Sequence, residues 1–272
     1  GCTMNFMEKL INAARKNNSL LCVGLDTDPE LIPKNVGVIE FNKAIIDATA
    51  DLVCAYKLNF AFYEAMGSDG FDALKQTVKS IPDDILAIGD AKRGDIGNTA
   101  KAYARAIFAK LDFDAATVSP YLGLDSIEPF LQYRDKGVFV LCRTSNAGAL
   151  DFQSLRLGEQ EKYLFEIVAQ KASEWNKFGN IGLVVGATYP EELRLIRQSH
   201  PDMPILIPGI GAQGGDLEQA VRYGVDAKGQ KAIINSSRQI IYASREKDFA
   251  VAARRAASAL RDQINSYLSG KN

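Results

Sequence analysis

Histidine is almost absent from this chain of 272 residues. The single histidine, His200, stands between Ser199 and Pro201, in a stretch that we expect to be a polar turn after a helix. A Ser-His-Asp or Cys-His nucleophile would have to use this one residue, and a metal site built on several histidines is excluded. Any chemistry must therefore rest on lysine, carboxylate and backbone groups.

Cysteine is also scarce, and the chain has no Cys-x-x-Cys pair. Cys22, Cys54 and Cys142 each lie in a short apolar run that predicts a buried strand. Cysteine in such a place usually acts as a small core residue. The sequence therefore predicts neither a structural zinc site nor a disulfide framework.

A charge imbalance and a long hydrophobic run are missing as well. The formal net charge is -1, which gives no electrostatic reason to expect nucleic acid or a membrane surface as a partner. No apolar run approaches the roughly 18–20 residues that a membrane span requires, and the N-terminus lacks the pattern of a secretory signal. We expect a cytoplasmic protein that starts naturally at Met4, with residues 1–3 left over from cloning.

What the sequence does contain is a regular alternation of short apolar runs and longer amphipathic stretches. The apolar runs are nearly continuous, as is typical of parallel strands covered on both faces. They predict strands at Leu20–Leu25, Val53–Asn59, Ile85–Asp90, Ala115–Ser119, Gly137–Cys142, Ile181–Val185, Ile205–Pro208 and Ala232–Asn235. Between them the pattern predicts helices, among them Ile39–Asp51, Asn98–Lys110, Glu159–Lys177 and Glu191–Gln198.

This order of elements predicts an α/β fold, a (β/α)₈ TIM barrel, whose typical length is roughly 250 residues. A doubly wound open sheet is the alternative, because element order alone does not separate the two. No linker rich in Pro, Gly or Ser divides the chain, so we expect residues 1–272 to form a single domain. In such barrels the active site lies at the carboxyl ends of the strands. Polar residues at those ends are therefore the candidates for function.

Two charged residues, Asp90 and Lys92, stand at the end of the predicted third strand. Residues two apart on a strand face the same way, so both side chains should point into the mouth of the barrel. Gly94 is expected to let the chain turn, and Asn98 or Thr99 to cap the next helix. Two charges on one face of a buried strand are costly unless they are paired. This favours a functional site over a solvated loop with an incidental ion pair.

Further charges gather at the same rim. Lys57 stands near the end of the second predicted strand, in an apolar stretch where a lysine is rarely buried without a partner. Asp26 follows the first strand, and Asp95 begins the loop after the third. Together with Asp90 and Lys92 they predict an array of alternating charges, in which each lysine is held between carboxylates.

The motif Asp90-x-Lys92-x-x-Asp95, with Lys57 on the preceding strand, resembles the signature of the orotidine 5′-monophosphate decarboxylase family. Residues 90–97 and 23–28 are similar to its longer, type 2 branch. The similarity continues through residues 208–216 and 235–238, and so covers almost the whole chain. Related barrels that act on sugar phosphates share the short charge motif, whereas all the segments in order are more specific.

The resemblance implies decarboxylation of orotidine 5′-monophosphate to UMP in pyrimidine nucleotide biosynthesis, with no cofactor and no metal. It implies that the Lys92 ammonium stabilises the carbanion at C6 and then protonates it, while Asp90 lies against the departing carboxylate. Lys57 and Asp95 would hold the array in register. The resemblance also implies a homodimer with shared sites, because Asp95 and Thr99 of such enzymes reach into the neighbouring subunit.

The loops after the last two strands predict a phosphate site, since such barrels commonly bind phosphate there. Gly209, Gly211 and Ser237 are candidates on these loops, and Arg238 can add a charge-assisted hydrogen bond. Simple turn chemistry is the alternative for the glycines. The resemblance places Gln213 on a loop that closes over the phosphate and the base.

The pyrimidine end of the site is predicted from the fifth strand. The resemblance places Ser145 against the base, while Asn146 or a simple turn is the alternative for this segment. Asp26 is a further candidate for substrate binding. Thr188 and Tyr189, after the sixth strand, are interpreted as ordinary loop residues.

Three other functions compete with this interpretation. A metal-dependent sugar-phosphate lyase, epimerase or synthase is disfavoured by lysines inside the carboxylate cluster. A Schiff-base aldolase through Lys57 or Lys92 is disfavoured because a lysine flanked by carboxylates keeps its proton. A non-catalytic barrel that binds a phosphate ligand would not need two lysines between carboxylates.

Overall fold

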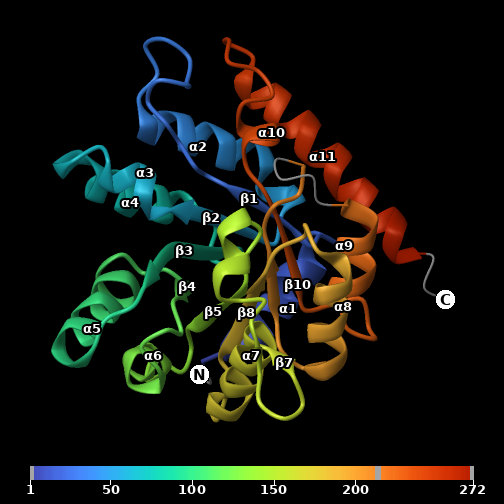
Figure 1. Ribbon diagram of the computed structural model, residues 1–272. Coiled ribbons are helices and arrows are strands. Elements are labelled where there is room, and N and C mark those ends of the chain that lie inside the picture. The colour runs from blue at the N-terminus through green and yellow to red at the C-terminus, as the bar shows by residue number, and fades with distance from the viewer. Residues whose placement is uncertain (1–2, 212–215, 270–272) are drawn as a thin grey trace.

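The computed structural model describes residues 3–211 and 216–269, in which eight parallel strands close into a barrel. Helices surround the barrel (Figure 1), and the strand order is β1-β10-β9-β8-β5-β4-β3-β2. The strands are β1 Leu21–Gly24, β2 Ala55–Asn59, β3 Leu86–Arg93, β4 Ala115–Val118, β5 Gly137–Arg143, β8 Ile181–Val185, β9 Ile205–Ile207 and β10 Ala232–Ser236. The closed barrel confirms the predicted TIM-barrel fold and excludes the open sheet.

Every predicted strand is present, with ends that differ by a few residues. The largest difference is in β3, which continues past its predicted end at Asp90 to Arg93. Its first five residues are buried and its last three are partly or fully exposed. The strand therefore carries Lys92 up to the rim of the barrel.

The helices follow the predicted alternation. They are α1 Phe6–Lys16, α2 Val38–Thr49, α3 Phe60–Glu64, α4 Ser68–Ser80, α5 Gly97–Ala104, α6 Leu124–Leu131, α7 Leu164–Trp175, α8 Pro190–Ser199, α9 Leu217–Gly224, α10 Arg238–Ile241 and α11 Phe249–Leu268. Short helical turns lie at Ala50–Leu52, Arg105–Lys110 and Ala147–Asp151. His200 ends α8, in the turn that the sequence predicts. None of the helices in the described ranges has the length and hydrophobicity that crossing a membrane requires.

Two helix predictions were wrong at their amino-terminal ends. Residues 159–163 are not helical: β6 (Arg156–Leu157) and β7 (Lys162–Tyr163) form a hairpin before α7. Gly158 and Glu161 have positive φ angles there, which a continuous right-handed helix does not allow.

The predicted cap of α5 was also wrong. Asn98 and Thr99 lie inside the first turn of the helix, and the capping position is Ile96, which makes no side-chain cap. Asp95 instead accepts a hydrogen bond from the Ile96 N–H at 2.8 Å. After Ala104 the helix continues as a π-helical turn over Arg105–Lys110.

The amino-terminal end of the barrel is filled by apolar side chains. Phe6 of α1 packs edge to face against Phe139 of β5, with ring centroids 5.9 Å apart. A Cβ atom added at Gly137 would lie 2.4 Å from the Phe6 ring, so the strand needs glycine there. Cys22 and Cys54 belong to the same buried cluster. These two cysteines and Cys142 are buried and unpaired, which confirms their predicted place in the core.

We expect Phe6→Ala to lower the free energy of unfolding by about 3–5 kcal/mol, because it empties the closed end of the barrel. The matched control is Phe152→Ala, which removes a ring that is 64% exposed and should cost no more than about 0.5 kcal/mol. Urea denaturation of both variants measures the difference. Equal losses would show that α1 does not close the core.

Candidate active site

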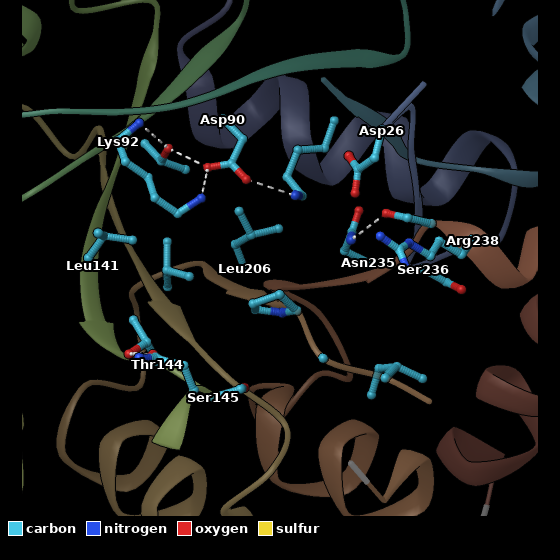
Figure 2. A pocket seen from close by; sticks show the side chains of 18 of the residues that line it. Asp26, Asp90, Lys92, Leu141, Thr144, Ser145, Leu206, Asn235, Ser236 and Arg238 are labelled. Atoms are coloured by element: carbon cyan, nitrogen blue, oxygen red, sulfur yellow. Dashed lines mark hydrogen bonds and ion pairs between the residues drawn. The ribbon is translucent and has the colours of Figure 1, made fainter. Parts of the chain in front are cut away.

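A pocket of about 340 Å³ opens at the carboxyl ends of the barrel strands. It is lined by Asp26, Lys57, Asp90, Lys92, Thr117, Leu141, Thr144, Ser145, Asn146, Val184, Leu206, Pro208, Gly209, Ile210, Asn235, Ser236, Ser237, Arg238 and Gln239 (Figure 2). Many of these residues lie two positions beyond an inward-facing core residue on the same strand, as Asp90 does beyond Ile88. The pocket is therefore the next layer of the barrel interior, in which polar groups replace apolar ones.

Asp90 is the centre of the charged wall. Its carboxylate is 7% exposed and lies 3.0 Å from Lys57 Nζ and 2.7 Å from Lys92 Nζ. The Thr117 hydroxyl donates a third hydrogen bond to it at 2.8 Å. The strand register explains why these side chains lie together, because Lys57 of β2 and Ala115 of β4 both lie opposite Ile88 of β3. Asp90 and Thr117, each two residues further on, point into the same space.

The surroundings of Asp90 and Lys57 determine the charge state of both side chains. Burial alone would raise the pKa of Asp90, but the ammonium groups of Lys57 and Lys92 and the Thr117 hydroxyl lower it far below its usual range. Burial likewise opposes the charge of Lys57, but the carboxylates of Asp90 and Asp26 outweigh it and raise the pKa of Lys57 well above its usual range. The buried pair is therefore a carboxylate and an ammonium.

Lys92 has a left-handed backbone conformation, with φ 49. Such a conformation is strained for lysine and persists only where the surroundings impose it. The Lys92 N–H donates to the Thr117 hydroxyl at 3.0 Å, which holds the backbone in place. Gly94, where the sequence predicts the chain to turn, is the first residue after β3, and its φ is not positive.

The predicted alternation of charges is only partly present. Both lysines share Asp90, whereas Asp26 acts on Lys57 through space and makes no ion pair with it. One oxygen of Asp26 is buried and has no hydrogen-bond partner. Asp95 is half-buried and Thr99 is exposed, and neither lines the pocket of its own chain.

The opposite end of the pocket carries Arg238. Figure 2 shows this guanidinium far along the wall from Lys92, with Asn235 and Ser236 beside it. Ser237 and Gly209 also line this end, as predicted, and Gly209 has a φ of 90 that favours glycine. One oxygen of Asn235 and the Ser236 hydroxyl are buried without protein partners, so both can bond to a ligand here.

The outcome differs for two further residues that were predicted at the phosphate end. Gly211 does not line the pocket, and a Cβ atom there would lie 2.1 Å from the side-chain nitrogen of Gln239. Its absent side chain therefore leaves room for Gln239, which does line the pocket. Gln213 lies outside the described residues.

The third side of the pocket comes from the loop after β5. Thr144, Ser145 and Asn146 line it, and the Ser145 hydroxyl is buried without a partner. A side chain at Gly186 would meet that hydroxyl at 1.9 Å, so this glycine makes room for it. Figure 2 shows Thr144 and Ser145 across the pocket from Asp90.

Tyr189, which was predicted to be an ordinary loop residue, lies in the loop before α8 and contacts a buried charge. Its ring stacks on the guanidinium of Arg143, which is 1% exposed, at 4.1 Å. Arg143 also forms an ion pair with Glu192 of α8 and donates to the Thr144 carbonyl at 2.8 Å. These contacts brace the loop that carries Ser145. The sequence held one sign of this role, namely a charged residue, Arg143, at the end of an otherwise apolar strand.

The pocket thus has ammonium groups and carboxylates at one end and a guanidinium at the other. Its apolar floor is made by Leu141, Val184, Leu206, Pro208 and Ile210. Among the described residues, no group of three or more acidic, histidine or cysteine side chains is placed to hold a metal ion. The arrangement suits a ligand with an anionic group for Arg238 at one end and a group that meets the Lys92 ammonium at the other.

Comparison with known proteins gives concordant matches. The model of the orotidine 5′-phosphate decarboxylase / HUMPS family matches residues 19–255. An orotidine 5′-phosphate decarboxylase of Dehalococcoides mccartyi is 57% identical over 267 residues, which is 97% of this chain and 98% of the relative. One of Herpetosiphon aurantiacus is 53% identical over 259 residues, 93% of this chain and 96% of the relative.

Solved structures agree with these relatives. The structure of Leishmania donovani OMP decarboxylase superposes with a TM-score of 0.85 at 41% identity, over 97% of this chain and 99% of that chain. A Toxoplasma gondii protein described as a putative orotidine-monophosphate-decarboxylase gives a TM-score of 0.90 at 39% identity, over 98% of this chain and 97% of that one. The chain belongs to the orotidine 5′-phosphate decarboxylase / HUMPS family.

Proposed function

We propose that this protein decarboxylates orotidine 5′-monophosphate to UMP, a step of pyrimidine nucleotide biosynthesis, and that Lys92 carries the chemistry. Relatives of 50–57% identity over nearly the full chain are named as this decarboxylase. The observation that carries the mechanism is the buried Asp90 carboxylate held between Lys57 and Lys92. Orotidine 5′-monophosphate carries a carboxylate on its ring and a phosphate far from it, and these two groups match the two ends of the pocket.

Loss of CO₂ from C6 of the pyrimidine leaves an electron pair that the ring carbonyls delocalise poorly. A fixed ammonium can stabilise this charge where it develops. In the proposed complex Lys92 lies at C6 and delivers its proton there, which gives UMP. Asp90 faces the departing carboxylate and raises the energy of the bound substrate. Lys57 and Thr117 keep Asp90 ionised and in place.

Binding at the remote end must contribute to catalysis. Enzymes typically lower a barrier by about 8–23 kcal/mol, more than one ammonium supplies. Arg238 and the loops around it would hold the phosphate, and the binding energy gained there would offset the cost of bringing two carboxylates together. Ser145, with its unpartnered hydroxyl, would bind the base.

The competing mechanisms need a different array. A divalent cation beside Asp90 would meet two ammonium groups within 3.0 Å of that carboxylate. A Schiff base needs a neutral amine, whereas the carboxylates favour the charged form of Lys57. Both observations support electrostatic catalysis by ammonium groups.

We further propose a homodimer with shared sites. Asp95 is half-buried and Thr99 is exposed, and both lie outside the pocket of their own chain. Ile96, next to Asp95 in the chain, is 56% exposed, and Tyr121 in the loop after β4 is 88% exposed. A second copy that covers this surface could receive Asp95 and Thr99 in its own pocket.

We also propose that the enzyme acts in the cytoplasm. Three cysteines of the described residues are buried and unpaired. Thiols persist in the reducing cytoplasm, whereas oxidising compartments favour disulfides. The buried thiols support this location.

The central test of the activity is to follow the absorbance of orotidine 5′-monophosphate with purified protein after exhaustive chelation of metals. We expect UMP and CO₂ to form at the same rate before and after chelation, because two ammonium groups already pair with the Asp90 carboxylate and would repel a divalent cation. Activity that disappears with the chelator and returns with Mg²⁺ would assign the site to the metal-dependent barrels.

Arg238→Ala should lower kcat/KM for orotidine 5′-monophosphate by about 10- to 100-fold, because a hydrogen bond to a charged group contributes roughly 1.5–3 kcal/mol. The residual reaction of orotidine, which lacks the phosphate, should scarcely change. Arg255→Ala, on the exposed face of α11, is the matched control and should affect neither substrate. An equal loss on both substrates would mean that Arg238 supports the fold or the chemistry.

Lys92→Ala and Asp95→Ala chains should complement one another. Each homodimer is expected to be nearly inactive, but a mixed dimer has one site without either lesion. Random assortment makes half of the dimers mixed, so activity should return to about a quarter of the wild-type value.

The matched control for this experiment is a mixture of Lys92→Ala and Asp90→Ala chains, which damages both sites of every mixed dimer and should recover nothing. Verified heterodimers of Lys92→Ala and Asp95→Ala that remain inactive would place the whole site within one chain.

A further inference from the structure

The Asp26 carboxylate lines the pocket, and one of its two oxygens is buried without a hydrogen-bond partner. Figure 2 shows it on the stretch of wall between Asp90 and Arg238. Its position must therefore be set by the backbone that carries it. Because Asp26 raises the pKa of Lys57, a displacement of this carboxylate would also disturb the charged array.

The backbone on either side of Asp26 is held by buried groups from other elements. The Leu25 N–H donates to the Lys57 carbonyl at 2.8 Å, and Tyr63 donates its hydroxyl to the Leu25 carbonyl at 2.8 Å. The buried Thr27 hydroxyl donates to the Asn42 amide oxygen at 2.6 Å. These bonds fix the segment on the side of β2 and α2.

Tyr242 holds the same segment from the opposite end of the chain. Its hydroxyl accepts a hydrogen bond from the Asp28 N–H at 2.9 Å and donates one to the Asp26 carbonyl at 3.2 Å. One phenol thus bridges both sides of Thr27. The Tyr242 ring stacks on Phe41 of α2, with centroids 6.2 Å apart, which fixes the direction of the hydroxyl.

Tyr242 also belongs to the element that carries the guanidinium of the pocket. It ends α10, which begins at Arg238, and its N–H donates to the Arg238 carbonyl at 3.0 Å. The side chains of Ile240 and Ile241, between the two, are buried. A single helical turn, anchored by these two buried side chains, therefore joins Arg238 to the hydroxyl that holds Asp26.

We propose that Tyr242 is a positioning residue that couples the Arg238 end of the pocket to the Asp26 carboxylate. An anion bound by Arg238 restrains α10, and the Tyr242 hydroxyl passes that restraint to Asp26 and so to its neighbour Lys57. This inference rests on the proposed function, because Tyr242 would link phosphate binding at Arg238 to the reaction at the other end of the pocket. The physical link is a pair of hydrogen bonds whose partners lie in two different binding regions.

Tyr242→Phe tests the link, since it removes the hydroxyl and keeps the stacked ring. We expect kcat/KM for orotidine 5′-monophosphate to fall by about tenfold, as for the loss of one to two hydrogen bonds. The same substitution should change kcat/KM by less than about twofold in an Arg238→Ala background, in an Asp26→Asn background, and with orotidine as substrate. Coupled residues give such non-additive effects, whereas independent ones add.

Tyr56→Phe is the matched control. It removes another buried phenol hydroxyl, which bonds Thr49 at 2.7 Å outside the pocket. It should lower the unfolding temperature about as much as Tyr242→Phe and leave kcat/KM unchanged. The thermal unfolding of all variants is measured together with their kinetics.

Two results would overturn the proposal. A tenfold loss by Tyr242→Phe in every background and with both substrates would show that the hydroxyl only supports the fold. No loss in the wild-type background would show that the bridge has no role. A wild-type protein that does not decarboxylate orotidine 5′-monophosphate would instead refute the proposed function, which the parallel wild-type assay reveals.

Discussion

The site depends on one interaction, the buried carboxylate of Asp90 between the ammonium groups of Lys57 and Lys92. Removing these charges from water is costly, and only close and complete pairing offsets that cost. Asp90 is paired in this way, because two ammonium groups and the Thr117 hydroxyl donate hydrogen bonds to its oxygens. Lys92 is half exposed to the pocket, so its remaining N–H bonds can meet a ligand.

The barrel makes this pairing possible by bringing three neighbouring strands to one place. Lys57, Asp90 and Thr117 come from β2, β3 and β4, and each follows an inward-facing core residue by two positions. The apolar layer beneath them, which Phe6 closes from below, gives a rigid floor. The fold thus supplies preorganisation, which electrostatic catalysis requires because groups that reorient during the reaction lose their advantage.

The sequence predicted much of this arrangement because the signals were local. Continuous apolar runs marked the strands, and the spacing of Asp90 and Lys92 placed both on one face. Thr117 could have been found in the same way, two residues beyond the inward-facing Ala115, but a threonine in a strand carries no signal of function. The left-handed backbone conformation of Lys92 and the Arg143–Tyr189 stack could not be predicted, because each depends on contacts between distant segments. The bridge from Tyr242 to Asp26 is of the same kind.

The account requires that the Lys92 ammonium supply both charge and proton. The most direct measurement is the single-turnover rate of UMP formation by Lys92→Ala with and without small amines. We predict a loss of at least about 10³-fold, partly restored by ethylammonium and not by tetramethylammonium, which carries charge but no proton. A Lys92→Ala rate within tenfold of the wild type would contradict the account, and so would equal rescue by both cations.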